Sequence, residues 1–424
     1  MYSTVWVCYN DRENGSNCAF MRDAGQCSRR GRIRSYRPAA GNARGQLFYS
    51  IKEDVVLGIF TDLFSNALGF TWQMGVMILV GLTLIYLAIK KDMEPALLLP
   101  MGFGAVLVNL PGINLLGITT LFNAGIETEL FPLLLFIGIG AMIDFGPLLS
   151  NPKMFLFGAA AQFGIFMTLL LARLIGFSHG DAGSIAIIGA ADGPTAIFVS
   201  QFFNSNYQGP IMVAAYSYMA LVPIIQPPVI RAITTKKERL IRMPYHPKDV
   251  SNVTRVLFPI FVTFIAGAIA PKSAELIGFL MFGNLIRECG VLGSLSATAQ
   301  KELANLTTLM LGISVAFKMQ ADMFVNLETL AIIGLGLFAF IFDTVGGVLF
   351  AKFLNLFVKE KINPMVGAAG ISAFPMASRV VHKMGRKEDP DNFLLMHAAG
   401  ANVSGQIASV IAGGLIISLI QPLL

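Results

Sequence analysis

One ionisable side chain stands in a stretch that is otherwise apolar enough for a membrane interior. Asp192 lies within residues 185–200, directly before Gly193 and Pro194. A carboxylate there costs about 3 kcal/mol or more on insertion, so we expect a polar partner or a bound cation beside it. Proline removes a backbone N–H, so the helix should break next to the acid and free carbonyl oxygens. A broken helix that carries an acid at membrane depth is typical of cation sites in ion-coupled transporters.

Four further side chains offer hydroxyl or amide oxygens: Tyr218, Asn363, Ser372 and Asn402. Together with Asp192 they form a set of hard ligands suited to Na⁺, and the sequence has no Cys/His cluster of the kind that transition metals prefer. The alternative for the asparagines and the serine is hydrogen bonding between helices. The alternative for Asp192 is a neutral, hydrogen-bonded acid.

Three other polar residues have two interpretations each. Arg379 could hold a carboxylate through two parallel hydrogen bonds, or could anchor a helix at the membrane interface. Asp343 also lies in the middle of an apolar segment, but no Gly-Pro break accompanies it. His397 could relay protons, although a core histidine with satisfied hydrogen bonds explains it equally.

The elements that position these residues must be membrane helices. Of 424 residues, 55% are hydrophobic and only 13% are charged, and the mean hydropathy is +0.67, whereas a soluble protein carries about 25% charged residues. Apolar runs of about 17–25 residues recur without the period-two alternation of strands. We therefore predict an all-α polytopic membrane protein. The sequence contains no phosphate-binding glycine motif, which argues against an ATP-driven motor, and its basic loops indicate cytoplasmic anchors rather than a nucleic-acid surface.

The first 50 residues differ in composition from the rest of the chain. They hold eight arginines, three acidic residues and three of the four cysteines, and they lack the apolar core of a secretory signal. We predict that residues 1–50 form a disordered extension. The transport unit is then divided into a first repeat at 51–250 and a second repeat at 251–424.

Four pairs of segments read alike in the same order along the two halves. Residues 189–196 match the segment that begins at Gly367, and residues 214–218 match 398–402. The offsets of the four pairs are 174, 178, 184 and 180 residues, so only the loops differ in length. Such a series indicates a duplicated unit. In this register Asp192 faces residues 370–372, and Tyr218 faces Asn402.

Loop charge predicts that the two repeats are inverted. The linker 231–248 and the loops 352–361 and 383–387 are rich in Lys and Arg, which marks them as cytoplasmic. The counterparts of those two loops, 173–183 and 201–209, carry Arg173 alone. We expect re-entrant hairpins at 184–203 and 362–382 and about ten spans, near residues 75–89, 95–110, 130–145, 154–176, 210–231, 253–270, 275–290, 304–319, 329–353 and 393–419.

Several of these runs also carry a resemblance to a known family. They are Gly-Ala-Ala-Asp-Gly-Pro-Thr-Ala at 189–196, the run Ala-Ala-Tyr-Ser-Tyr-Met-Ala-Leu-Val-Pro-Ile-Ile-Gln-Pro-Pro at 214–228, and residues 281–288 and 363–373. From about residue 70 onward the chain resembles the β subunits of sodium-pumping biotin-dependent decarboxylases. Members of that family act on oxaloacetate, methylmalonyl-CoA or glutaconyl-CoA.

The resemblance implies a function and roles for particular residues. A subunit of this kind decarboxylates carboxybiotin, consumes a proton and exports Na⁺ with the free energy released. The family's Na⁺ ligands would be Asp192, Ser372, Tyr218 and Asn402. Its catalytic positions would be Ser372, Arg379 and Tyr218. Its carboxybiotin-binding positions would be Asn363, Gly367 and Arg379, with Gly367 allowing close backbone approach.

The resemblance also implies partners and an architecture. The biotin would be held by a partner biotin carrier, alongside an α carboxyltransferase subunit and a small γ or δ membrane subunit. The complex would be an oligomer in the bacterial cytoplasmic (inner) membrane, and its core would move against a scaffold as in elevator-type transporters. The alternative function is a stand-alone Na⁺-coupled carboxylate symporter of similar architecture.

Overall fold

The computed structural model describes residues 6–11, 15–20, 69–91, 94–112, 116–244 and 250–424. The chain divides into two units, residues 1–65 and 66–424. In the first unit, β1 (Trp6–Asp11) pairs antiparallel with β2 (Gly15–Phe20) in a hairpin, within a segment for which we predicted no structure. The remainder of the predicted disordered extension lies outside the described residues.

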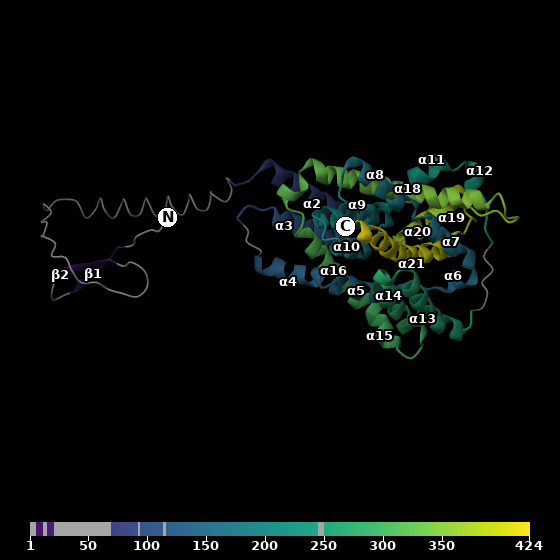
Figure 1. The fold of residues 1–424 in the computed structure, drawn as a ribbon, viewed down its shortest axis with the longest axis horizontal. Helices are drawn as coiled ribbons and strands as arrows, with labels where there is room; N and C mark the ends of the chain where they lie inside the picture. Colours follow the sequence, from purple (N-terminus) through teal and green to yellow (C-terminus); the bar gives the residue numbers. More distant parts are fainter. Residues whose placement is uncertain (1–5, 12–14, 21–68, 92–93, 113–115, 245–249) are drawn as a thin grey trace. The chain divides into compact units, whose positions relative to one another are not determined.

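The described residues of the second unit form helices and no strand, as predicted for an all-α membrane protein (Figure 1). Six segments are long and apolar enough to cross a membrane, or seven if the pair α4–α5, which bends by 58°, counts as one span. The six are α2 (Trp72–Lys91), η1 to α8 (Pro152–Ile175), α11 (Gln208–Ile233), α13 (Asn252–Ile269), α18 (Leu327–Leu354) and α21 to η5 (Leu395–Leu423).

The predicted number of ten spans is not confirmed. Three predicted spans correspond to shorter helices: α3 (Pro95–Val108), α14 (Ala274–Glu288) and α16 (Ala304–Ala316). At 1.5 Å per residue, 13 to 15 helical residues cover about 20 Å, which is less than the apolar thickness of a typical bilayer.

The rest of this unit, together with the parts of the composite segments, consists of short helices and the 26-residue α21. They are α4 (Leu116–Glu127), α5 (Leu130–Met142), α6 (Gly146–Ser150), η1 (Pro152–Met154), α7 (Phe155–Ala160), α8 (Phe163–Ile175), α9 (His179–Ala186), η2 (Ile187–Ala190), α10 (Gly193–Phe202), α12 (Lys236–Arg239), η3 (Pro271–Ser273), α15 (Gly293–Thr298), η4 (Ala299–Leu303), α17 (Ala321–Phe324), α19 (Met365–Ala368), α20 (Met376–Glu388), α21 (Leu395–Ile420) and η5 (Gln421–Leu423).

Two helix breaks lie where the sequence predicts hairpins. Ala191, with φ of +51°, and extended Asp192 separate η2 from α10, and Pro194 lies in the first turn of α10. Residues 369–375 separate α19 from α20, and Pro375 immediately precedes α20. Proline is favoured at a helix start because no intrahelical partner is lost there, so both breaks follow from the local sequence.

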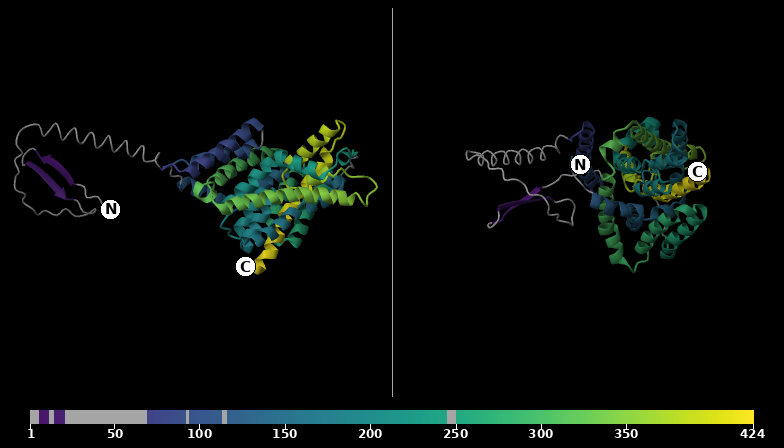
Figure 2. Two further views of the ribbon diagram at one scale, coloured as in Figure 1. Left: turned by 90° about the horizontal axis from the view of Figure 1, so that it is seen from above. Right: turned by 60° about the vertical axis from the view of Figure 1, so that its left-hand side comes forward.

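Two groups of helices surround these breaks. The first contains α7 to α11 and α18 to α21, where α18 packs on α8, α11 and α19, and α21 packs on α7 and α20. The second contains α2, α3, α5, α13, α14 and α16, where α5 packs on α14 and α3 on α16. Figure 2 shows the green helices α13 to α15 gathered at one side of the larger bundle. We call these the break group and the wall group.

Candidate functional site

Asp192 is buried at the first break and held by neutral partners. Its side chain is 3% exposed. Oδ2 accepts hydrogen bonds from Thr195 Oγ1 at 2.7 Å and from Ser409 Oγ at 3.1 Å. No Lys or Arg among the described residues forms an ion pair with it. Its N-cap position on α10 also favours an anion, because the N-terminal end of the helix dipole is positive.

Ser372 joins the second break directly to the first. Its backbone N–H and its Oγ both donate to the carbonyl of Ala190, at 3.3 and 2.5 Å. The structure therefore joins Ser372 to Ala190, which lies two positions before Asp192 in the sequence. The repeat register predicts that these two segments face each other. The hydroxyl oxygen still has lone pairs with which it can accept a proton or bind a cation.

A cavity of about 280 Å³ is lined by Asp192, Ser372 and Arg379 together. Arg379 lies in the first turn of α20, where the helix dipole disfavours a cation. Its guanidinium has no ion pair or hydrogen bond with any described residue. Since the guanidinium stays charged, the cavity can hold a cation beside the carboxylate and an anion beside the guanidinium.

Asn402 braces the second break from α21. The side chain is fully buried, and its Nδ2 donates to the carbonyl oxygens of Ile371 and Ala373, at 2.7 and 3.5 Å. Its Oδ1 is buried without a hydrogen-bond partner among the described residues. An orphaned amide oxygen beside the break suits a cation ligand, although Asn402 does not line the cavity of Asp192.

Tyr218 makes its contacts away from this group, and its predicted role at the Na⁺ site stays a prediction. Its hydroxyl donates to the carbonyl of Ile333 on α18, and its ring lines an apolar cavity with residues of α2. Tyr216 lines the cavity of Asp192 instead, and its buried hydroxyl has no partner among the described residues. A methyl group on Gly193 would lie 2.2 Å from the Tyr216 ring. Helix residues two apart point about 200° apart, so only one of the two tyrosines can face Asp192.

Asn363 and Gly367 are engaged in protein contacts away from the cavity. Asn363 Nδ2 donates to the carbonyls of Arg239 and Ile241, both at 2.9 Å, and its Oδ1 accepts from Met365 N. A Cβ on Gly367 would lie 2.0 Å from the carbonyl oxygen of Gly347 on α18. The close backbone approach predicted for Gly367 is therefore present, but its partner is α18. Neither residue lines the cavity of Asp192, and the carboxybiotin contact that the family resemblance implies for them stays a prediction.

The linker between the halves is clamped onto residues that lie before α19 and after α20, on the two flanks of the second predicted hairpin. Asn392 Nδ2 donates to the same two carbonyls as Asn363, at 3.3 and 3.2 Å. Arg242 holds Asp389 through two hydrogen bonds of 2.6 and 2.9 Å, and these hold the pKa of Asp389 below its usual value. No sequence pattern indicates this clamp, because its backbone carbonyl acceptors carry no side-chain signal.

Two residues of α21 were missed although a signal for them exists. Gln406 lines the cavity and Ser409 donates to Asp192. With Asn402 they stand at i, i+4 and i+7 of an apolar helix, so the three side chains share one face. Within the described ranges no three His, Cys, Asp or Glu residues gather as a metal cluster. A cation at the first break would rely on the Asp192 carboxylate with hydroxyl, amide and carbonyl oxygens, which suits Na⁺, while Glu94 is a second acid in the lining of the cavity.

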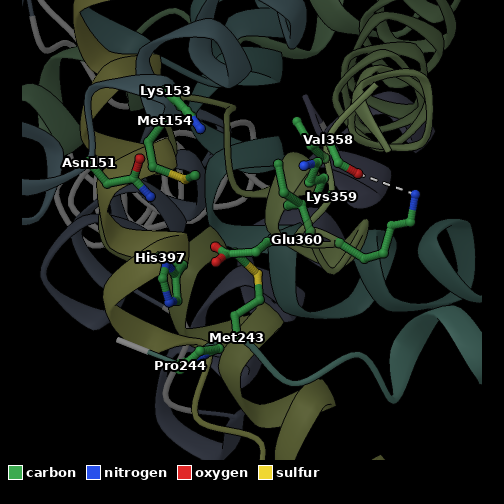
Figure 3. Close-up of a pocket in the computed structure, with 11 residues that line it drawn as sticks. Asn151, Lys153, Met154, Met243, Pro244, Val358, Lys359, Glu360 and His397 are labelled. Carbon is green, nitrogen blue, oxygen red and sulfur yellow. Dashed lines mark hydrogen bonds between the residues drawn. The ribbon is translucent and has the colours of Figure 1, made fainter. Parts of the chain in front are cut away.

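A second cavity, of about 590 Å³, lies near the linker and is lined by Lys153, Met243, Glu360 and His397 among others. In Figure 3 the Lys153 ammonium and the Glu360 carboxylate point into it, and Lys361 Nζ donates to the Val358 carbonyl at 3.3 Å. None of the predicted Na⁺, catalytic or carboxybiotin residues lines it.

Asp343, the competing acid, is fully buried and accepts from Ile165 N at 3.2 Å, so it caps α8. Neither feature displaces the cavity of Asp192 as the candidate site.

Comparison with known proteins identifies close relatives. The family model described as Na⁺-transporting oxaloacetate decarboxylase beta subunit matches residues 73–420. The methylmalonyl-CoA decarboxylase subunit beta of Propionigenium modestum is 48% identical over 372 residues, covering 81% of this chain and 94% of that protein. The glutaconyl-CoA decarboxylase subunit beta of Acidaminococcus fermentans is 48% identical over 359 residues, covering 84% and 96%. The oxaloacetate decarboxylase beta chain of Klebsiella pneumoniae is 43% identical over 410 residues, covering 81% and 94%.

Proposed function

The chain belongs to the family of Na⁺-transporting oxaloacetate decarboxylase beta subunits, and from this premise we propose that it couples decarboxylation of carboxybiotin to export of Na⁺. The observation that carries the proposal is the single cavity lined by Asp192, Ser372 and Arg379. An acid with only neutral partners and an unpaired guanidinium face one space, so a cation and an anion can bind there together.

In the reaction the bond between the ureido nitrogen and the carboxylate carbon breaks. CO₂ leaves, the electron pair stays on the ureido group, and a proton completes biotin at that nitrogen. Arg379 orients the carboxylate before cleavage, because a guanidinium matches its two oxygens. Ser372 lies at the second break beside Ala190 and passes the proton through its hydroxyl.

Coupling follows from the charges in the cavity. Na⁺ at Asp192 and the substrate carboxylate attract each other strongly, because the surroundings are buried and of low dielectric. When CO₂ leaves, the cation loses that partner and binds less tightly. The difference in affinity between the two states drives release of Na⁺ to the outside. Asn402, with its orphaned Oδ1, supplies a further oxygen along this route.

The proposed movement is of the elevator type, in which the break group slides against the wall group. Support comes from the way the helices pair. If α2, α3 and α5 correspond to α13, α14 and α16, then the contact α2–α3 maps onto α13–α14, and α5–α14 maps onto α16–α3. An internal twofold relation between inverted repeats produces this exchange of partners. The inverted repeats and the ten spans are part of this proposal.

The relatives' names also support a complex. Each is a beta subunit or beta chain, and three different substrates appear among them: methylmalonyl-CoA, glutaconyl-CoA and oxaloacetate. We therefore place this chain in a bacterial inner membrane with an α carboxyltransferase, a biotin carrier and a small γ or δ subunit. The carboxyltransferase, rather than this chain, selects the acyl substrate.

The test is parallel measurement of transport and chemistry. The complex is purified with its partners and reconstituted into inside-out vesicles, and ²²Na⁺ uptake is followed together with CO₂ release. We expect both to require the biotin carrier and to be blocked by avidin. Uptake of Na⁺ without decarboxylation contradicts the proposal and supports the carboxylate symporter.

A further inference from the structure

The cavity of Asp192 has a second wall, formed by residues to which the family resemblance assigns no role. Besides the two breaks, it is lined by Gln300 of η4 and by Asn305 and Thr308 of α16. Asn305 and Thr308 belong to the wall group, and Gln300 lies on η4, which packs on α5 and α16 of that group, whereas Asp192, Ser372 and Arg379 belong to the two breaks or follow them. η4 is a π-helix of five residues. Such segments interrupt a regular helix, change the direction of its side chains and occur frequently at functional sites.

Asn305 is the most informative residue of this wall. It is exposed in an apolar helix, and its amide has no hydrogen bond with any described residue. An amide without a partner is costly in an apolar environment, since its N–H and C=O groups each lose a hydrogen bond to water. Its position on the cavity therefore indicates that an occupant or water supplies those bonds.

The two neighbours of Asn305 add complementary groups. Gln300 Nε2 donates to Ser296 Oγ at 2.9 Å, which fixes the side chain and leaves Oε1 available as an acceptor. Thr308 lines the cavity with a hydroxyl that can donate or accept. These three side chains thus offer uncharged N–H donors and carbonyl and hydroxyl acceptors, and Glu94, which precedes α3, is the acid in this part of the lining.

A carboxylate only accepts hydrogen bonds, so the charged donor Arg379 matches it better than this set, in which acceptors are present as well as donors. This set suits a neutral group that both donates and accepts. A ureido ring has a carbonyl oxygen and, on the nitrogen that is not carboxylated, one N–H. The two faces of the cavity therefore match the two parts of carboxybiotin.

We propose that Asn305 and Gln300 bind the ureido ring of carboxybiotin, an inference that rests on the proposed function. Asn305 Nδ2 donates to the ureido carbonyl oxygen, and Gln300 Oε1 accepts the ureido N–H. When the N–C bond breaks, the electron pair left on the ureido nitrogen is shared with that oxygen. The Asn305 amide then stabilises the charge that develops, so Asn305 is a catalytic residue and Gln300 a binding residue.

The experiment uses the reconstituted complex with the variants Asn305→Ala, Asn305→Asp and Gln300→Ala. The matched control is Asn252→Ala, because Asn252 is an exposed asparagine in the first turn of α13 and does not line the cavity. Decarboxylation is measured against the concentration of carboxylated biotin carrier at saturating Na⁺. The Na⁺ concentration for half-maximal rate is measured in parallel.

We expect Asn305→Ala to lower kcat/KM about tenfold, as for loss of one hydrogen bond that tightens in the transition state. Asn305→Asp should lower it at least as much, because a carboxylate cannot donate. Gln300→Ala should raise KM and leave kcat within about twofold. The Na⁺ half-saturation of all three should equal that of Asn252→Ala.

Three results separate the possible failures. If Asn305→Ala and Asn305→Asp match Asn252→Ala in kcat/KM, the ureido assignment is wrong. If either variant instead shifts the Na⁺ half-saturation, the residue belongs to the cation route and the assignment is again wrong. Should Asn305→Ala fail to co-purify with its partners, the isosteric Asn305→Asp decides alone. Failure of the proposed function itself appears as a wild-type complex that lacks biotin-dependent decarboxylation.

Discussion

The two helix breaks deliver opposite charges to one cavity. The first carries Asp192 at the N-cap of α10, and the second is followed by Arg379 in the first turn of α20. Both begin a helix with a proline, Pro194 or Pro375, so their backbones are interrupted for the same reason. The comparison teaches that two breaks of similar form offer two chemistries: the first suits a cation, and the second suits an anion, which we propose is the substrate carboxylate.

The breaks also differ in how they are held. Hydroxyl donors from Thr195 and Ser409 hold the first one, through the carboxylate itself. Amide donors hold the second through its backbone or its flanks, from Asn402 inside the bundle and Asn363 at the linker. Loss of a partner at the first break should therefore change ion binding, whereas loss at the second should first change the shape of the break.

The largest effect is expected from Asp192→Asn. The change removes the charge and keeps the shape, so the cation loses the carboxylate at the first break, and Glu94 is the other acid that lines this cavity. We expect Na⁺-dependent decarboxylation to be abolished in reconstituted vesicles while the complex still assembles. The matched control is Asp343→Asn, a fully buried acid whose Oδ1 accepts from Ile165 N, a bond that asparagine can keep. Normal Na⁺ stimulation in Asp192→Asn would show that the first break is not the cation site.

The second prediction addresses the anionic half of the comparison. Arg379→Ala should slow carboxybiotin decarboxylation about 100-fold at saturating Na⁺, because charge-assisted hydrogen bonds to the carboxylate are worth about 1.5–3 kcal/mol. Arg379→Lys should restore part of the rate, since it keeps the charge without the two-pronged geometry.

The control for this pair is Lys383→Ala, an exposed cation one turn further along α20. Single-turnover release of CO₂ and the Na⁺ half-saturation are both measured. A changed Na⁺ half-saturation with an unchanged single-turnover rate in Arg379→Ala would assign Arg379 to ion binding and erase the difference between the breaks.

A smaller effect is expected at Asn402, whose amide both braces the second break and offers an oxygen to the cation. Asn402→Ala removes both the orphaned Oδ1 and the brace on Ile371. We expect the Na⁺ concentration for half-maximal rate to rise about tenfold, equal to about 1.4 kcal/mol. Asn284 provides a close control, since it is fully buried, donates to the carbonyl of Ile143, and also has an unpartnered Oδ1. If Asn284→Ala raises the Na⁺ requirement equally, the orphaned oxygen of Asn402 is not a ligand.

Local chemistry explains what the sequence could predict. The break at Asp192 follows from Pro194, which acts within one turn, and the contact of Ser372 with Ala190 follows from the repeat register. The helical class follows from hydropathy alone. The number of spans does not, because hydropathy does not show that the predicted span at 304–319 forms only the 13-residue α16, which follows the π-helix η4.

Helix phase and tertiary contacts explain what the sequence could not predict. The repeat register pairs Tyr218 with Asn402, but offsets that vary from 174 to 184 residues cannot fix the rotation of a helix. Tyr216, two residues earlier, faces the cavity instead. Asn363 binds backbone carbonyls that are more than 120 residues away in the sequence, and Gly367 contacts Gly347 on α18. No local pattern distinguishes such contacts from ligand binding.

The smallest effects are expected where the linker meets the second break. Asn363 and Asn392 donate to the same carbonyls, of Arg239 and Ile241, but only Asn363 also accepts from Met365 N. Asn363→Ala should therefore destabilise the protein by about 2 kcal/mol and Asn392→Ala by about 1 kcal/mol, since each buried hydrogen bond contributes about 0.5–1.5 kcal/mol. Thermal unfolding in detergent gives the order of the two.

Because neither side chain lines the cavity, both variants should keep the wild-type Na⁺ half-saturation and KM for the biotin carrier. If Asn363→Ala instead raises that KM while its unfolding temperature stays unchanged, Asn363 binds carboxybiotin as the family resemblance implies, and the second break recognises the substrate at its linker end as well as in the cavity.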